Sequence, residues 1–427
     1  MTHLDRIWWH VYPLGAAGAP IRDRAPDDSG HRLARLEGWL DYVVDLGCTG
    51  LLLGPVFASG THGYDTLDHF RLDPRLGDDA AWDRFAAAAA QRGLAIVLDG
   101  VFNHVGAQHP AVRESLDAGH GLVRVRHHDG GRSAATWEGH GDLAELDHDN
   151  PAVADLVTDV MCHWLDRGAA GWRLDVAYAV PTGFWAHVLG RVRARHPEAL
   201  FIGEVIHGDY AAIAAASTLD SLTQYELWKA IWSSINDRNM WELAAALERH
   251  ERFSRGSQGS EGSQGSQAAV MQTFVGNHDV TRIASRVGDA GAALAATTLL
   301  TLPGMPSVYY GDEQAFRGEK GRGFEADDAL RPALPDSPGE LAPYGWWLHD
   351  LYRDLIALRR RNPWLTRGAV RVTAKDNGRI TYAVTSVDAS AGSGRELAVE
   401  VRVAPVASAR VWLDGVEVFA WSAALAA

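Results

Sequence analysis

Cysteine is almost absent from this sequence, which has 2 cysteines, Cys48 and Cys162, in 427 residues. Neither belongs to a Cys-x-x-Cys or Cys-x-x-His spacing, and both have apolar sequence neighbours. We therefore expect two buried free thiols in a reducing compartment, and neither a disulfide scaffold nor a zinc site. The sequence also lacks a run of about 18 apolar residues and an N-terminal basic stretch followed by an apolar one. These absences predict a cytoplasmic protein that does not cross a membrane.

Basic residues are outnumbered by acidic ones. Lysine and arginine number 40 and aspartate and glutamate 54, which gives a formal net charge of −14. Nucleic acids and anionic membranes attract basic surfaces, so neither is an expected partner. A neutral or cationic ligand fits this charge better. The hydrophobic content of 47% is enough for a large core.

Short apolar runs alternate with amphipathic helical stretches along most of the chain, which is typical of βα units. No Gly-x-Gly-x-x-Gly motif follows the first of these runs, so a dinucleotide-binding open sheet is not supported. Eight such runs favour an α/β fold of the TIM (β/α)8 barrel type, and a helix is expected over 33–46. The expected strands are 7–12, 51–53, 96–99, 171–175, 200–204, 220–223, 271–275 and 307–310.

The regular alternation is interrupted in three places. Residues 106–149 are rich in histidine, glycine and aspartate and predict a short insertion after the third strand. A Gly-Ser-Gln tract over 256–267 predicts a flexible surface loop without chemistry. Alternating β-rich runs over 366–427 predict a small C-terminal all-β domain. The catalytic barrel is then expected to comprise residues 1–105 and 150–365.

The stretch from Gly171 to Asp175 alternates with a period of two. Trp172 and Leu174 should face one side of a strand, and Arg173 and Asp175 the other. A buried guanidinium beside a carboxylate is costly unless the two groups serve each other. Arg173 should also keep Asp175 ionised, which is the state that a nucleophile needs. A structural ion pair at the end of a strand is the alternative reading.

A second carboxylate, Glu204, follows Asp175 by 29 residues, about one βα unit. The two should therefore end neighbouring strands roughly 4.8 Å apart, close to the ~5–5.5 Å separation of a retaining glycosidase. No cation adjoins Glu204 in the sequence, so it is the better candidate for the protonated general acid. Asp279 is a third carboxylate, able to stabilise positive charge on a sugar ring. Taken singly, Glu204 could be a loop acid and Asp279 a helix N-cap.

Four motifs stand in order along the chain: Asp99-Gly-Val-Phe-Asn-His104, Gly171-Trp-Arg-Leu-Asp175, Gly203-Glu204-Val and Val275-Gly-Asn-His-Asp279. With His62-Gly-Tyr64-Asp65-Thr they resemble the signatures of glycoside hydrolase family 13, the α-amylase family, over about residues 5–365. The resemblance implies that Asp175 is the nucleophile, Glu204 the acid/base and Asp279 the stabiliser of the transition state.

The same resemblance suggests how an α-glucan oligosaccharide is held. Tyr64 would stack under the sugar, and His104, Arg173 and His278 would hydrogen-bond its hydroxyls. Asp327 and Arg331 resemble the pair that grips the sugar on the non-reducing side, although a surface ion pair in a charged loop is an alternative. We expect His62, Asp65 and His207 to help shape neighbouring sugar subsites. Among the tryptophans, Trp8, Trp9 and Trp137 are the better candidates for sugar stacking because they lie at strand ends or in the insertion, but packing is the favoured role for each.

No metal or other cofactor is expected to be required. Asn103 matches a residue that binds calcium in many family members, so a structural calcium near it is conceivable, but the acidic residues of the insertion do not match the usual ligands. The segment Gly203-Glu-Val-Ile-His207 looks most like the cyclomaltodextrinase and maltogenic amylase branch. The first predicted strand begins near Ile7, so we expect no N-terminal β domain of the kind found in that branch. The oligomeric state stays open.

Three functions are compatible with these residues. The first is a retaining hydrolase that cleaves α-1,4-glucosidic bonds in linear or cyclic malto-oligosaccharides through a β-glycosyl-aspartate intermediate. The second is a transglycosylase of the same family that transfers α-glucosyl or maltosyl units to a sugar acceptor. The third is a non-catalytic carbohydrate-binding barrel. The complete set of carboxylates favours the enzymes over the binding protein.

Overall fold

The computed structural model describes the chain except for residues 1, 23–28, 256–268, 324, 388–393 and 425–427. The predicted Gly-Ser-Gln loop at 256–267 lies outside the described residues. Among the described residues, no helix is both long and apolar enough to span a bilayer.

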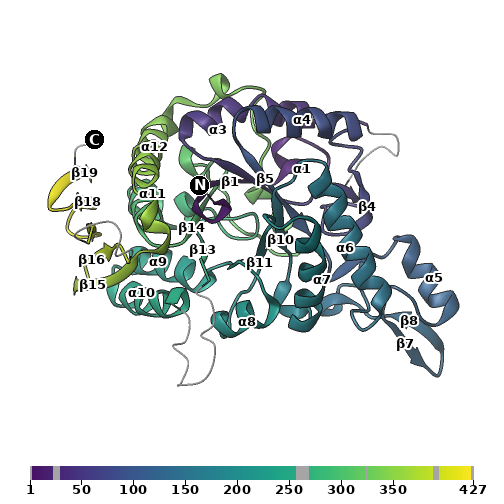
Figure 1. The fold of residues 1–427 in the computed structure, drawn as a ribbon. Coiled ribbons are helices and arrows are strands. Elements are labelled where there is room, and N and C mark those ends of the chain that lie inside the picture. The colour runs from purple at the N-terminus through teal and green to yellow at the C-terminus, as the bar shows by residue number, and fades with distance from the viewer. Residues whose placement is uncertain (1, 23–28, 256–268, 324, 388–393, 425–427) are drawn as a thin grey trace, which may run out of the picture.

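Eight parallel strands form the centre of the molecule (Figure 1), in the order β12-β11-β10-β5-β2-β1-β14-β13. A parallel bridge between Thr223 and Gln272 joins the two ends of this order, so the sheet closes on itself. The predicted (β/α)8 barrel is therefore confirmed. The strands are β1 (Trp8–Val11), β2 (Gly50–Leu53), β5 (Ala95–Gly100), β10 (Gly171–Leu174), β11 (Leu200–Gly203), β12 (Ser221–Leu222), β13 (Gln272–Phe274) and β14 (Met305–Tyr309).

Helices surround the barrel and bury one face each against the strands (Figure 1). The predicted helix over 33–46 is divided in two, because the chain turns at Gly38 and Trp39 so that the buried Trp39 ring stacks on Trp9 at 6.4 Å. The helices are α1 (Pro13–Ala16), α2 (Leu33–Glu37), α3 (Leu40–Leu46), α4 (Asp79–Gln91), α6 (Pro151–Asp166), α7 (Thr182–Arg195), α8 (Tyr210–Ser217), α9 (Tyr225–Asn236), α10 (Met240–Arg255), α11 (Ile283–Thr301) and α12 (Trp346–Arg361).

Two of the three candidate tryptophans, Trp8 and Trp9, are part of the core. Trp8 is 0% exposed and packs in one buried cluster with Leu52 and Val97 from the neighbouring strands. Trp9 is 2% exposed and lies on the other face of β1, against the helix layer. Trp8 and Trp9 therefore have the packing role that is favoured over sugar stacking, because a strand inside a parallel barrel is covered on both faces.

Additional elements adjoin the barrel on opposite sides in Figure 1. The insertion between β5 and α6 contains β6 (His104–Gly106), α5 (Pro110–Ala118), β7 (Val125–His128), β8 (Gly131–Ala134), the short helix η2 (Trp137–Gly139) and β9 (Leu143–Glu145). The hairpin of β3 (Phe57–Ser59) and β4 (Thr66–Leu72) follows β2. A five-stranded antiparallel sheet ends the chain, with β15 (Ala369–Lys375), β16 (Arg379–Thr385), β17 (Glu396–Arg402), β18 (Ser408–Leu413) and β19 (Val416–Ser422). The predicted insertion and C-terminal β-structure are thus confirmed.

One buried hydrogen bond ties the C-terminal sheet to the barrel. The Tyr382 hydroxyl on β16 lies 2.6 Å from Thr301 Oγ1 at the end of α11. Thr301 Oγ1 donates its own proton to the Thr297 carbonyl, 2.7 Å away, so Tyr382 is the donor between the two hydroxyls. This bond joins the sheet to a barrel helix at a place without solvent access.

We expect Tyr382→Phe to lower the free energy of unfolding by about 1 kcal/mol, because it deletes one buried neutral hydrogen bond and keeps the ring. Urea denaturation measures the loss. The kinetic constants on any sugar substrate should stay at wild-type values, since Tyr382 lies outside the cavity described below. A change in those constants would contradict a purely structural role.

Candidate active site

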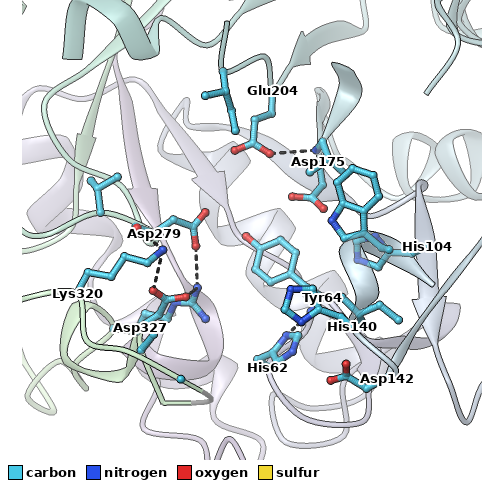
Figure 2. Close-up of a pocket in the computed structure, with 18 of the residues that line it drawn as sticks. His62, Tyr64, His104, His140, Asp142, Asp175, Glu204, Asp279, Lys320 and Asp327 are labelled. Atoms are coloured by element: carbon cyan, nitrogen blue, oxygen red, sulfur yellow. Dashed lines mark hydrogen bonds and ion pairs between the residues drawn. The ribbon is translucent and has the colours of Figure 1, made fainter. Parts of the chain in front are cut away.

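Three carboxylates follow barrel strands and line one cavity of about 510 Å³. In the register of β10 and β11, Leu174 lies opposite Gly203, so Asp175 and Glu204 leave the barrel side by side. The Glu204 amide donates to the Leu174 carbonyl at 2.9 Å, which continues the ladder by one step. Figure 2 shows Asp175 and Glu204 on one side of the cavity and Asp279 on another.

A single guanidinium holds the two neighbouring carboxylates. Arg173 Nη1 donates to Asp175 Oδ1 at 3.2 Å, and Arg173 Nη2 lies 2.7 Å from Glu204 Oε1. Nη1 also donates to both oxygens of Asp99, at 2.6 and 2.7 Å. Glu204 therefore has a cation beside it in space, although none adjoins it in the sequence. The contact runs across two strands, so adjacency in the sequence does not reveal it.

Glu204 receives two further hydrogen bonds. Its Oε1 accepts from the Tyr225 hydroxyl at 2.9 Å, and its Oε2 accepts from the Val176 amide at 3.0 Å. With Arg173, three donors therefore converge on a side chain in a residue that is 5% exposed. Tyr225 was not among the predicted site residues. Its only sequence signal is its position three residues after the short strand β12.

Burial raises the pKa of Asp175 well above its usual range, and the charge of Glu204 raises it further. Arg173 acts in the opposite direction but does not outweigh these two effects. Arg173 therefore favours the ionised form of Asp175, as expected, but it is not the largest influence on the pKa of that carboxyl. Two carboxyls this close share a proton more easily than they carry two charges.

Asp279 has the opposite electrostatic setting. Burial alone would raise its pKa, but His278 and Arg331 outweigh burial and hold the pKa of Asp279 well below its usual range. His278 Nε2 lies 3.1 Å from Asp279 Oδ2, and Arg331 Nη2 donates to Asp279 Oδ1 at 2.8 Å. Asp279 is thus a fixed negative charge on the cavity wall.

The predicted pair of Asp327 and Arg331 reaches this wall. Arg331 Nη2 also donates to Asp327 Oδ2 at 3.1 Å, so one guanidinium joins Asp327 to Asp279. Lys320, which was not predicted, donates to the Asp279 carbonyl at 2.8 Å and lies 3.3 Å from Asp327 Oδ1. All four residues line the cavity and are not a remote surface ion pair.

Tyr64 lines the cavity and is supported from behind. Its ring stacks on His278 with centroids 5.4 Å apart and an angle of 11°, and its hydroxyl donates to Asp99 Oδ2 at 3.0 Å. The Tyr64 hydroxyl also contacts His278 Nε2. His278 and Arg173 are 0% and 4% exposed and do not line the cavity themselves. They instead hold residues that do line it: His278 contacts Tyr64, and Arg173 contacts Asp175 and Glu204.

His104 lines the cavity, and its ring is fixed by neighbouring side chains. The Asn103 carboxamide nitrogen lies 3.2 Å from His104 Nδ1, which leaves the proton on Nε2. That Nε2 is buried and has no hydrogen-bond partner within the protein. Burial lowers the pKa of His104 to about 4, so the ring is neutral at pH 7. Trp137 stacks against it at 6.4 Å and also lines the cavity.

Asn103, which matches a calcium-binding position in many family members, contacts a histidine here: its carboxamide nitrogen lies 3.2 Å from His104 Nδ1. Within the described parts of the chain, no group of three or more His, Cys, Asp or Glu side chains is arranged to hold a metal ion.

Asp65 and His207 do not line the cavity, although both were predicted to shape it. Asp65 is 7% exposed and accepts a hydrogen bond from Thr61 Oγ1 at 2.8 Å, so it holds the turn that carries His62 and Tyr64. His207 is exposed beyond the rim. His62 does line the cavity, as expected.

Sequence comparisons agree with this geometry. A family profile described as "Alpha amylase, catalytic domain" matches residues 27–128 and 137–336. Neopullulanase 2 of Thermoactinomyces vulgaris is 30% identical over 400 residues, which are 88% of this chain and 64% of that protein. A cyclomaltodextrinase of Geobacillus thermopakistaniensis is 27% identical over 89% of this chain and 67% of its own length. The chain thus spans about two thirds of the length of these relatives.

The fold comparison leads to the same group. The cyclic α-maltosyl-(1→6)-maltose hydrolase of Arthrobacter globiformis, solved with its cyclic sugar, superposes with a TM-score of 0.78. It is 26% identical, and the match covers 95% of this chain and 92% of that one. The chain belongs to glycoside hydrolase family 13, the α-amylase family, and is similar to its cyclomaltodextrinase and neopullulanase branch.

Proposed function

We propose that this protein is a retaining glycoside hydrolase that cleaves α-1,4-glucosidic bonds in linear or cyclic malto-oligosaccharides. The observation that carries the proposal is the pairing of Asp175 and Glu204 at the ends of adjacent strands, held by Arg173 on the wall of one cavity. Adjacent strands lie about 4.8 Å apart, which favours the short carboxyl separation of a retaining enzyme.

The reaction has two steps at this pair. In the first, Glu204 gives its proton to the glycosidic oxygen while an Asp175 oxygen attacks the anomeric carbon from the opposite face. The leaving sugar departs with that proton, and a β-glycosyl ester of Asp175 remains. In the second, Glu204 takes a proton from water, the resulting hydroxide attacks the anomeric carbon, and Asp175 is released as a carboxylate. The product keeps the α-configuration.

Other cavity residues supply binding and charge stabilisation. The ionised Asp279 faces the cavity and can stabilise positive charge on the sugar ring in the transition state. The Tyr64 ring offers an apolar face for the sugar, and the neutral His104 ring lines the same cavity. Arg331 and Asp327 offer both a donor and an acceptor at the Asp279 side.

Several observations support malto-oligosaccharides as the substrate class. The relatives above include a cyclomaltodextrinase and a hydrolase solved with a cyclic maltosyl-maltose. The net charge of −14 also suits an uncharged sugar. A transglycosylase would use the same β-glycosyl ester with a sugar hydroxyl in place of water, so product analysis has to separate the two.

We expect Glu204→Gln to lower kcat/KM on maltotriose and cyclodextrin by about 10²- to 10⁴-fold, because the general acid is removed. The loss should be small for the first step on α-maltosyl fluoride, whose leaving group needs no proton. Asp175→Asn should abolish turnover of both kinds of substrate. Glu114→Gln on the exposed face of α5 is the matched control and should be fully active. Wild-type hydrolysis by Asp175→Asn would remove the proposal.

A second prediction concerns pH. Asp175 attacks only when ionised, so kcat/KM should fall as pH drops through its raised pKa, and the acidic limb should lie above the ordinary carboxyl range of about 3.9. Glu204→Gln removes the negative charge that contributes to this rise. The acidic limb for α-maltosyl fluoride should therefore move to lower pH in Glu204→Gln. If the acidic limb of Glu204→Gln stays at the wild-type pH, the charge of Glu204 does not affect the pKa of Asp175.

The third prediction concerns the products. Proton NMR during early hydrolysis should show the α-anomer of the released sugar first, followed by slow mutarotation. Chromatography of digests of cyclodextrins, starch, maltotriose, pullulan and cyclic maltosyl-maltose should show products no longer than the substrates. Longer products would identify a transglycosylase, and a β-anomer first would exclude the retaining mechanism.

A further inference from the structure

Tyr225 connects the two sides of the active site through hydrogen bonds. Its hydroxyl donates to Glu204 Oε1 at 2.9 Å and accepts from Asn277 Nδ2 at 2.9 Å. Asn277 Oδ1 in turn accepts from the Asp279 amide at 2.9 Å. Three hydrogen bonds therefore run from the carboxylate of Glu204 on one side to the backbone of Asp279 on the other.

The direction of each bond follows from this arrangement. The Asp279 amide can only donate, so the carboxamide oxygen of Asn277 must face it and the nitrogen must face Tyr225. The Tyr225 oxygen accepts from that nitrogen. Its single proton is therefore directed at Glu204. Asn277 is 6% exposed, so water does not compete freely for these groups.

Packing fixes the ring that carries this hydroxyl. Tyr225 is the first residue of α9, and the Gln224 side chain caps the helix by accepting from the Leu227 amide at 3.3 Å. The ring lies edge-on against Phe274 of β13, with centroids 5.0 Å apart. It meets Trp228 in the same manner at 5.9 Å. The hydroxyl is thus held at one place relative to Glu204.

We propose that Tyr225 is a positioning residue for Glu204, oriented by Asn277, and that its hydroxyl promotes proton release from Glu204 to the leaving group. A donor aimed at a carboxylate stabilises the charged form that appears when the proton leaves. The inference rests on the proposed function, because it assigns Tyr225 a part in the acid step. The ring is not required to touch the sugar.

The groups that face Glu204 come from four elements. Arg173 and Asp175 adjoin it from β10, and Asp99 acts on it from β5. Tyr178 in the short helix η3 (Ala177–Ala179) and Tyr225 on α9 are the phenols near its charge. Tyr225→Phe removes one donor from this set and leaves the others in place.

The test is Tyr225→Phe, assayed on maltotriose and on α-maltosyl fluoride. We expect kcat/KM on maltotriose to fall about 10- to 100-fold, as for loss of a hydrogen bond to a charged group. The alkaline limb of its pH profile should move to higher pH, because the charged form of the acid has lost a donor. The first step on the fluoride should stay near wild type. Tyr382→Phe, the same deletion at a distant buried tyrosine, should change neither substrate.

Other outcomes overturn the proposal. An equal loss on both substrates, or a pH profile that falls in parallel with the wild type, would mean that Tyr225 only supports the fold. Asn277→Ser keeps an oxygen for the Asp279 amide but does not reach Tyr225. If Asn277 acts through Tyr225, the double variant should lose no more than the worse single variant. Additive losses would remove the orienting role of Asn277.

The Glu204→Gln background separates this inference from the proposed function. With the acid already removed, Tyr225→Phe should cause no further loss on maltotriose, and an additional loss would count against positioning. Full maltotriose activity of Glu204→Gln itself would instead refute the proposed function. The two failures are therefore distinct.

Discussion

The active site depends on one buried cation. The Arg173 guanidinium is 4% exposed and contacts Asp99, Asp175 and Glu204, each of which is 7% exposed or less. A buried charge is tolerable only when its partners are close and well directed, and here three carboxylates meet one guanidinium. The cluster therefore carries an excess of acid over base. Such an excess favours retention of a proton, which is what acid catalysis at neutral pH requires.

On the side of the cavity that carries Asp279, the ratio of acidic to basic side chains is different. Asp279 meets Arg331 and the His278 ring, and burial does not prevent it from staying ionised. Two kinds of carboxylate thus line the same cavity, one pair able to share a proton and one acid fixed in its charged state. The difference arises from the ratio of acids to cations on each wall, since all three carboxylates are partly or fully buried.

The sequence predicts those parts of the site that follow directly from strand order. The eight strands, the placement of Asp175 and Glu204 on adjacent strands, and the position of Tyr64 are visible in short motifs. The Arg173–Glu204 contact is not, because it depends on the register of β10 and β11. The sequence also does not predict the hydrogen bond from Tyr225 to Glu204, because this bond depends on where α9 begins after the two-residue strand β12. The sequence alone does not decide between stacking and packing for Trp8 and Trp9, because strand-end tryptophans give no sign of which layers cover them.

The barrel closes between its shortest strand, β12, and β13. β12 has two residues, and a single bridge from Thr223 to Gln272 connects it to β13. The Glu204–Tyr225–Asn277 contacts cross this same join just above the bridge. Opening of this join on heating would move Glu204 away from Asp279 while the other seven strand pairings of the barrel stay formed. Heat inactivation is then expected to precede global unfolding, and a cross-link between β12 and β13 is expected to delay it.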